Sequence, residues 1–86
     1  SYIYKDSLGW FHFLKGNYPE ALKVLLEAEQ AIEKPEAGDA EILDHIGQVY
    51  EKLKDPVKAK AYYEKALKLS PKDERVQKRL GALKGS

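Results

Sequence analysis

The sequence predicts an all-α fold, a solenoid of stacked antiparallel helix hairpins. Leucine or isoleucine is directly followed by glycine three times, at Leu8-Gly9, Ile46-Gly47 and Leu80-Gly81. Alanine follows each of the first two glycines at the same offsets, 12 and 19 residues later. No segment shows the two-residue alternation of apolar and polar side chains that is typical of a half-buried strand. Internal repetition of this length indicates stacked helical hairpins rather than a closed globular domain.

Glycine and proline divide the chain into about five expected helices. The first covers residues 1–15 and ends at the helix-stop signal formed by Gly16 and Asn17. Asn17 is also a good N-cap for the second helix, which carries Pro19 in its first turn. Apolar residues recur every three or four positions along this second helix, and it is expected to end before Pro35.

The second half of the chain repeats this pattern after a connecting segment. Residues 34–39 contain proline and glycine and are expected to form a loop. Asp39 is the expected N-cap of the third helix, and Pro56 begins the fourth, which ends at Ser70. The last helix follows Asp73, with apolar residues on one side and Lys or Arg on the other.

Small residues occur where the two helices of each hairpin are expected to cross. Gly9 and Ala21 mark this crossing in the first hairpin, and Gly47 and Ala59 mark it in the second. Larger side chains would push the helix axes beyond the usual separation of about 8–10 Å. Aromatic residues such as Tyr63 are then expected to fill the space between one hairpin and the next.

These positions resemble the tetratricopeptide repeat family over essentially the whole chain. The matches are Leu8-Gly9, Tyr18, Ala21, Leu25 and Ala28 in one repeat and Ile46-Gly47, Tyr50, Ala59, Tyr63, Ala66 and Pro71 in the next. We expect one domain over residues 1–86, with repeats at about 2–35 and 40–73 and a capping helix at about 74–84. The resemblance, which is greatest to bacterial members, implies a right-handed superhelix that binds other proteins.

The chain departs from the family pattern in two places. Gly9 and Gly47 are 38 residues apart rather than 34, which predicts either a longer second helix or a bulged loop. His12 stands where Tyr50 stands in the second repeat, and we expect it to be a core histidine that replaces an aromatic residue. The chain also lacks methionine, even at position 1, so we expect it to be a fragment of a longer protein.

Composition excludes several classes of function. The 15 basic and 14 acidic side chains leave a net charge of +1, which provides no field for nucleic acid or an anionic membrane. No apolar run reaches the roughly 18 residues of a membrane span, and no signal-peptide pattern is present. Without cysteine there are no disulfides or thiolate metal sites, and we expect no metal or cofactor. These features leave the cellular compartment open.

The family resemblance implies that the first helix of each repeat lines the concave face and contacts the partner. The candidate residues are therefore Asp6, Trp10, Phe13, Asp44, His45, Gln48, Arg75 and Arg79. The surface would change from aromatic through acidic to basic, with Trp10 and Phe13 as an apolar anchor for a peptide or helix. Alternatively, both rings pack against a missing upstream repeat, and the two arginines are solvated residues of the cap.

Two more specific functions are not expected. One subclass of the family binds the C-terminal carboxylate of heat-shock chaperones through Lys, Asn and Arg side chains. The corresponding positions here are Asp6, Trp10, His45, Arg75 and Arg79, and Asp6 would repel a carboxylate. Asp6 and His45 could approach across the groove, but no nucleophile, metal-ligand or phosphate-loop pattern accompanies them, so we expect no enzyme.

Two hypotheses for function follow. In the first, the chain is an interaction module that binds a partner peptide or helix in its concave groove. In the second, it is a structural spacer or a self-association segment of a longer array, because an exposed apolar end can pair with another copy.

Overall fold

The computed structural model describes residues 1–85, and five α-helices make up most of this range. They are α1 (Tyr2–Leu14), α2 (Tyr18–Gln30), α3 (Ala40–Lys52), α4 (Pro56–Leu69) and α5 (Glu74–Lys84). One short 3-10 turn, η1 (Ala37–Asp39), precedes α3. No strand occurs between residues 1 and 85, and the predicted all-α class is confirmed.

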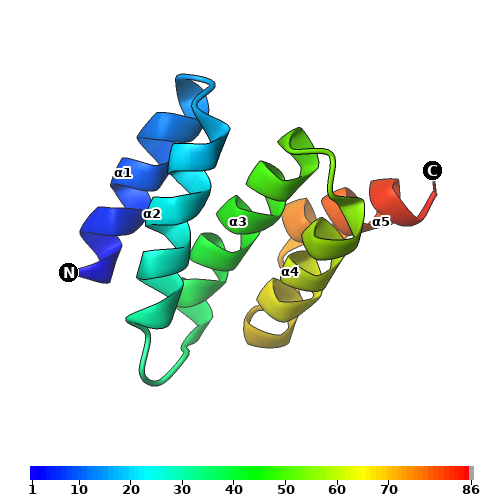
Figure 1. Cartoon of the computed structure of the whole chain (residues 1–86). Coiled ribbons are helices and arrows are strands. Elements are labelled where there is room, and N and C mark those ends of the chain that lie inside the picture. The colour runs from blue at the N-terminus through cyan, green and yellow to red at the C-terminus, as the bar shows by residue number, and fades with distance from the viewer. Residues whose placement is uncertain (86) are drawn as a thin grey trace.

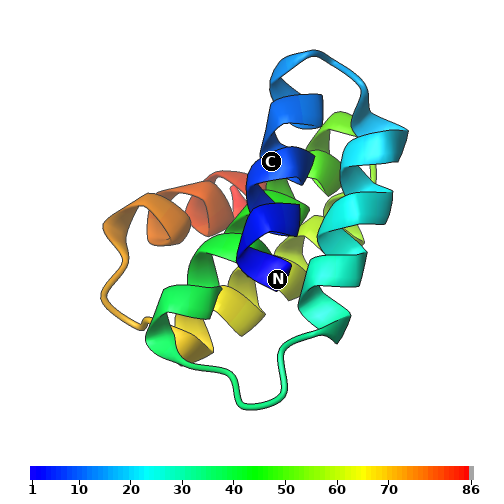
Figure 2. The same ribbon diagram turned by 90° about the vertical axis from the view of Figure 1, so that its left-hand side faces the viewer.

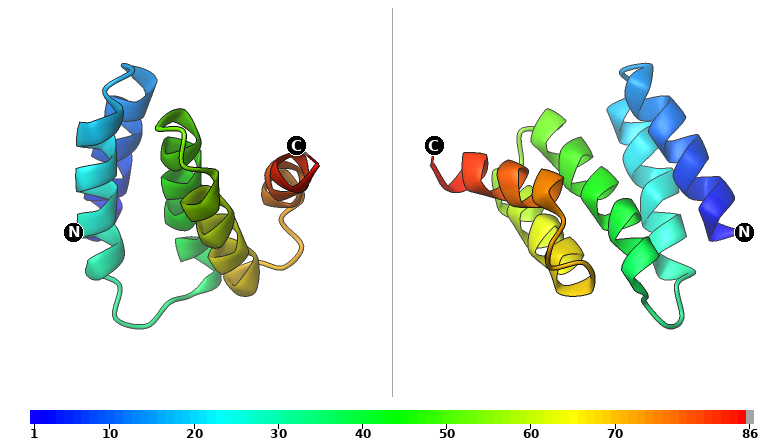
Figure 3. Two further views of the ribbon diagram at one scale, coloured as in Figure 1. Left: turned by 45° about the vertical axis from the view of Figure 1, so that its right-hand side comes forward. Right: turned by 180° about the vertical axis from the view of Figure 1, so that it is seen from behind.

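The helices form two antiparallel hairpins followed by a single helix. α1 pairs with α2 and α3 with α4, while α2 also packs on α3 and α4 on α5 (Figure 1). Figure 2 looks along the stack from its N-terminal end and shows successive hairpins turned relative to one another. Seen from behind, α1, α3 and α5 lie in front of α2 and α4 (Figure 3, right). Within the described residues, no helix is long and apolar enough to cross a membrane.

Both hairpin turns have the same backbone geometry although their residues differ. After α1, the N–H of Asn17 donates to the carbonyl of His12 at 2.9 Å, and Gly16 has φ +81°. After α3, the N–H of Asp55 donates to Tyr50 at 2.9 Å, and Lys54 has φ 64°. A left-handed residue that ends the helix is the usual C-terminal stop, and here it also reverses the chain.

The extra residues between the repeats form a loop rather than a longer helix. α2 ends at Gln30, and η1 occupies the end of the expected loop. Asp39 lies at the N-cap of α3, but its side chain does not cap that helix as predicted. Instead it accepts from the N–H of Glu36 and from the hydroxyl of Tyr2, each at 2.9 Å. The hydrogen bond to Asp39 raises the pKa of Tyr2 and ties the start of α1 to the loop.

The core consists of two apolar clusters, one on each side of α3. The first joins α2 and α3 through Ala21, Leu25, Ala28, Ile42, Ile46 and Val49. The second joins α3, α4 and α5 through Ala40, Leu43, Ala59, Tyr63, Ala66, Val76 and Leu80. The predicted small residues are buried at the crossings, but the side chains closest to the two glycines are those of Leu25 and Tyr63. Close packing there requires glycine.

His12 does not lie in the core, contrary to the prediction. It is partly exposed, belongs to neither cluster and meets the ring of Phe11 edge-on. Its counterpart Tyr50 packs against both clusters, because α3 has α2 on one side and α4 on the other. α1 has no hairpin on its outer side among the described residues, and the aromatic position therefore is not enclosed.

The buried side chain of Tyr63 makes the stability of the fold depend on pH. Its ring is fully buried, and its hydroxyl donates to Glu51 Oε2 at 2.7 Å. Burial raises the pKa of Tyr63, and the hydrogen bond to Glu51 raises it further. Because a tyrosine in the unfolded chain ionises near about pH 10, the folded state keeps this proton to higher pH. The stability that this difference in pKa contributes is fully present below about pH 10. It is lost as the pH rises towards the pKa of Tyr63 in the folded state.

We therefore expect the free energy of unfolding to fall above about pH 10, by about 1.4 kcal/mol per pH unit for Tyr63. Tyr63→Phe should remove this part of the slope, although it loses about 1 kcal/mol of hydrogen bonding at neutral pH. Urea unfolding of both proteins between about pH 9 and about pH 11 measures the difference. Equal slopes would contradict the expectation.

Candidate functional site

The candidate site lies on the side of the stack formed by α1, α3 and α5, which we call the lining face (Figure 3, right). All eight predicted site residues come from these three helices. The structure brings seven of them into two sets of contacts, one of Asp6, Trp10, Phe13 and His45 and the other of Asp44, Gln48 and Arg79. Residues from three helices therefore form two adjoining groups on one surface.

A stack of three rings forms the first group. The indole of Trp10 lies against Phe13, one turn along α1, with ring centroids 4.5 Å apart and planes at 11°. Its other neighbour is His45 of α3, at 4.1 Å and 18°. Phe13 also meets Tyr18 at the start of α2, at 5.5 Å. Trp10 and Phe13 are partly exposed whereas His45 is buried, so the stack presents apolar surface from a fixed base.

His45 is held in place by two carboxylates. Its Nδ1 lies 2.8 Å from Asp6 Oδ1, which confirms the predicted approach of these side chains across the face. Since an ionised carboxylate only accepts hydrogen bonds, Nδ1 carries the proton and donates it. Nε2 faces Glu41 Oε1 at 3.8 Å. With carboxylates at both nitrogens and Trp10 over the ring, the imidazole links α1 to α3.

The second group is a bidentate ion pair between α3 and α5. Arg79 donates from Nε to Asp44 Oδ1 at 2.9 Å and from Nη2 to Asp44 Oδ2 at 3.0 Å. Gln48 Nε2 adds a hydrogen bond to Oδ2 at 3.2 Å. The hydrogen bonds to Asp44 raise the pKa of Arg79. Asp44 is only 5% exposed, so its charge is matched by Arg79 rather than by water.

This pairing changes the electrostatic character expected from the sequence. The acidic and basic parts of the lining face neutralise each other at Asp44 and Arg79 instead of lying free for a partner. Arg75 belongs to neither set of contacts: its side chain is 75% exposed and lies 3.8 Å from Asp73 Oδ1. The most exposed cation of the predicted site is thus separate from both sets.

Sequence reasoning missed one supporting residue. Tyr18 was recognised as a repeat position, but its contact with Phe13 was not expected. The signal was the aromatic pair on either side of the turn at Gly16, where the end of one helix and the start of the next must lie close together. Tyr18 limits the movement of Phe13 and so of the ring stack.

Comparison with known proteins agrees with this architecture. A family model described as tetratricopeptide repeat matches residues 3–72, which include both hairpins. The chain is also similar to the type IV pilus assembly protein PilF of Pseudomonas aeruginosa, with 35% identity over 65 residues. This match covers 76% of the chain and 25% of PilF, so the chain spans about a quarter of that relative's length. The match across two hairpins with glycine at equivalent crossings shows that the chain belongs to the tetratricopeptide repeat family.

Proposed function

We propose that the chain is a protein-interaction module that binds a segment of a partner protein across the lining face, without a chemical step. Family membership supports the general role, because repeats of this kind generally mediate protein–protein interactions. The name of the similar protein, a type IV pilus assembly protein, supports a role within a larger protein assembly.

The ring stack of Phe13, Trp10 and His45 is the observation that carries the proposal. Trp10 lies between the other two rings, and the hydrogen bond from His45 to Asp6 fixes the base of the stack. A binding anchor that is already ordered loses little conformational entropy when a partner docks. Exposed tryptophan is also enriched among the residues that dominate interface energetics.

The paired charges favour a particular kind of partner segment. Because Asp44 and Arg79 satisfy one another, a highly charged ligand would gain little from either without breaking their bidentate contact. An apolar side chain can instead cover Trp10, while Glu41 beside His45 and Gln48 beside Asp44 offer hydrogen-bonding groups on the same face. We therefore propose a partner segment with an aliphatic or aromatic anchor and few charges.

Phe13→Ala is expected to weaken partner binding by at least about tenfold, because it removes one side of the anchor. Peptides selected from a random displayed library on the purified chain would serve as ligands. Trp10 is the chain's single tryptophan, so its fluorescence reports each titration directly and remains available in this variant. Calorimetry of Trp10→Ala with the same peptides provides a second measurement.

Phe11→Ala is the matched control for this experiment. Phe11 is also an aromatic residue of α1, but it is 53% exposed and lies outside the ring stack. Affinity should be unchanged in this variant. If Phe11→Ala abolishes binding while Phe13→Ala does not, the partner does not use the lining face and the proposal fails.

A second candidate function, association with another hairpin, is supported by the outer side of α1. Tyr4, Leu8 and Phe11 lie 38 residues before Ile42, Ile46 and Val49, which pack on α2 in the core. The exposed fractions of Tyr4 and Phe11 are 67% and 53%. A hairpin of another copy, or of the same longer protein, could cover them as α2 covers α3. Light scattering of Phe11→Asp against the unmodified chain tests this candidate, since a lower mass in the variant supports self-association.

A further inference from the structure

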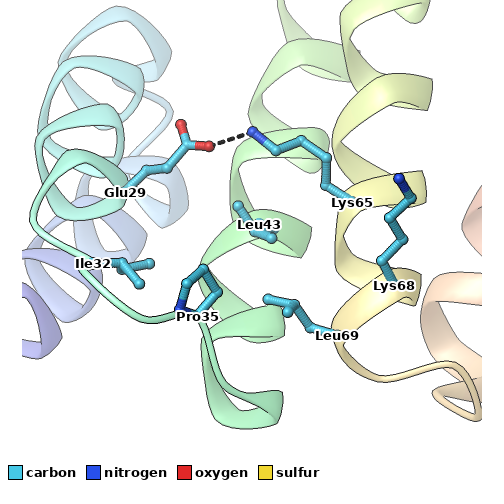
Figure 4. Close-up of a pocket in the computed structure, with 7 residues that line it drawn as sticks. All are labelled: Glu29, Ile32, Pro35, Leu43, Lys65, Lys68 and Leu69. Atoms are coloured by element: carbon cyan, nitrogen blue, oxygen red, sulfur yellow. Dashed lines mark hydrogen bonds and ion pairs between the residues drawn. The ribbon is translucent and has the colours of Figure 1, made fainter.

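The opposite side of the stack has an apolar hollow between α2 and α4 (Figure 4). It is a recess of about 410 Å³, open to solvent on one side. This volume falls within the range of about 300–1,000 Å³ typical of ligand sites. Its lining residues are Glu29, Ile32, Pro35, Leu43, Lys65, Lys68 and Leu69. None of them belongs to the lining face, so the recess does not rest on the function proposed for Trp10.

The recess owes its shape to the long connection between the repeats. Ile32 and Pro35 belong to the segment after α2, where the chain exceeds the 34-residue spacing seen between Gly47 and Gly81. Both residues form one end of the recess, and Leu43 of α3 forms its floor (Figure 4). The recess is therefore a property of this chain's insertion rather than of each repeat.

The inner surface is apolar. Ile32, Pro35, Leu43 and Leu69 contribute hydrocarbon side chains from three different segments. Leu43 is buried, while Ile32 and Leu69 are partly buried, so apolar surface remains in contact with water inside the recess. Covering it with one aliphatic or aromatic side chain would be favourable by the usual hydrophobic effect.

Three charged side chains lie at the rim of the recess, and two of them already form an ion pair with each other. Lys65 Nζ contacts Glu29 Oε2 at 2.6 Å and lies 4.5 Å from the centre of the Tyr62 ring. Glu29 also accepts from the Tyr62 hydroxyl at 2.7 Å, so this carboxylate has two partners. Lys68 has no ion-pair partner among residues 1–85, and its ammonium group is the unpaired charge at the rim.

The helix α4, which forms one wall of the recess, carries more basic than acidic side chains. α4 itself has Lys58, Lys60, Lys65 and Lys68 against Glu64 alone. Only Lys65 and Lys68 of these lysines line the recess, and Lys65 is already paired with Glu29, so the unpaired ammonium group of Lys68 favours an anionic group on the ligand.

We propose that this recess binds a short peptide segment in which a bulky apolar residue stands next to an acidic one. The apolar side chain fills the space over Leu43 and Leu69, and the carboxylate lies at Lys68 Nζ. A peptide suits the site better than an enclosed small molecule, because the recess is open on one side and small-molecule sites cover most of their ligand. The chain would then have two independent protein-binding surfaces on opposite sides.

The test uses capped peptides and nuclear magnetic resonance of the whole chain. The probe is acetyl-Ser-Leu-Glu-Ser-amide, with Gln in place of Glu and Ala in place of Leu in two control peptides. We expect saturating shifts of the methyl signals of Ile32, Leu43 and Leu69 with the probe, and weaker binding of both controls. Lys68→Glu should weaken binding by at least about fivefold, because it replaces an attraction by a repulsion.

Lys60→Glu is the matched control, since it makes the same charge change on α4 outside the recess. Equal weakening by Lys60→Glu would mean non-specific charge attraction and would overturn the proposal. Absence of saturating shifts would overturn it as well, as would binding of hexanoate without binding of the peptide. Shifts confined to the Trp10 indole would support the lining face and overturn this site, so the two proposals fail separately.

Discussion

Gly47→Ala is expected to lower the free energy of unfolding by about 2 kcal/mol, although alanine is the better helix former by about 1 kcal/mol. A Cβ atom at this position would lie 2.5 Å and 2.7 Å from the Cε1 and Cδ1 atoms of Tyr63. The Tyr63 ring is fully buried and its hydroxyl is bonded to Glu51, so it cannot move aside freely. The helices α3 and α4 would have to separate.

Gly81→Ala is a control with the same chemical change at the equivalent position of the last helix. A Cβ atom there meets nothing within 4 Å. This variant should be more stable than the unmodified chain by about 0.5–1 kcal/mol, because only the helix propensity changes. Urea unfolding followed by circular dichroism measures both. If Gly47→Ala and Gly81→Ala change the free energy of unfolding in the same direction, the distance between the crossing helices does not explain the effect of Gly47→Ala.

Arg79→Ala is expected to cost about 2 kcal/mol of stability. It leaves the carboxylate of Asp44, which is 5% exposed, without its bidentate partner. The expected value lies between those of an exposed ion pair and a fully buried one, because the Arg79 side chain is still 30% exposed. Loss of the pair also removes the polar link between α3 and α5.

Arg75→Ala is the matched control on the same helix. The Arg75 side chain is 75% exposed, and its contact with Asp73 is 3.8 Å long, so its removal should change stability by less than about 0.5 kcal/mol. Adding Asp44→Ala to Arg79→Ala should recover part of the loss, because no unpaired charge then remains. If Arg75→Ala and Arg79→Ala are equally destabilising in urea unfolding, the ion pair is not the stabilising contact.

Local sequence was sufficient for the helices and their pairing. Gly16 and Asn17 end one helix and begin the next, and Pro56 begins α4 where predicted. These signals act within one or two turns of the chain through backbone geometry, since Gly16 adopts the left-handed conformation that ends α1, although Asn17 makes no side-chain cap hydrogen bond to α2. The assignment of the candidate site to α1, α3 and α5 came from the resemblance to the repeat family rather than from local spacing.

The connection between the repeats could not be predicted in the same way. The segment after Gln30 contains good helix formers, and its four extra residues fitted a longer helix as well as a loop. The choice depends on contacts with distant elements: Tyr2 of α1 bonds to Asp39, and Ile32 packs on the apolar cluster between α2 and α3. The recess proposed as a second binding surface results from that choice.

The sequence by itself determined that this protein is a stack of helical hairpins, with glycine where the two helices of each hairpin cross. These features follow from short-range spacing. The resemblance to the repeat family implied that Trp10, Asp44 and His45 lie on the helices that line the binding face. Only the tertiary structure decided which of these groups remain available to a partner. The Asp44–Arg79 pair joins residues 35 positions apart, and His45–Asp6 joins residues 39 apart. Such pairs form only when the stacking angle brings distant helices together. A charged side chain on a helical face can therefore already be paired within the protein and be unable to bind a ligand.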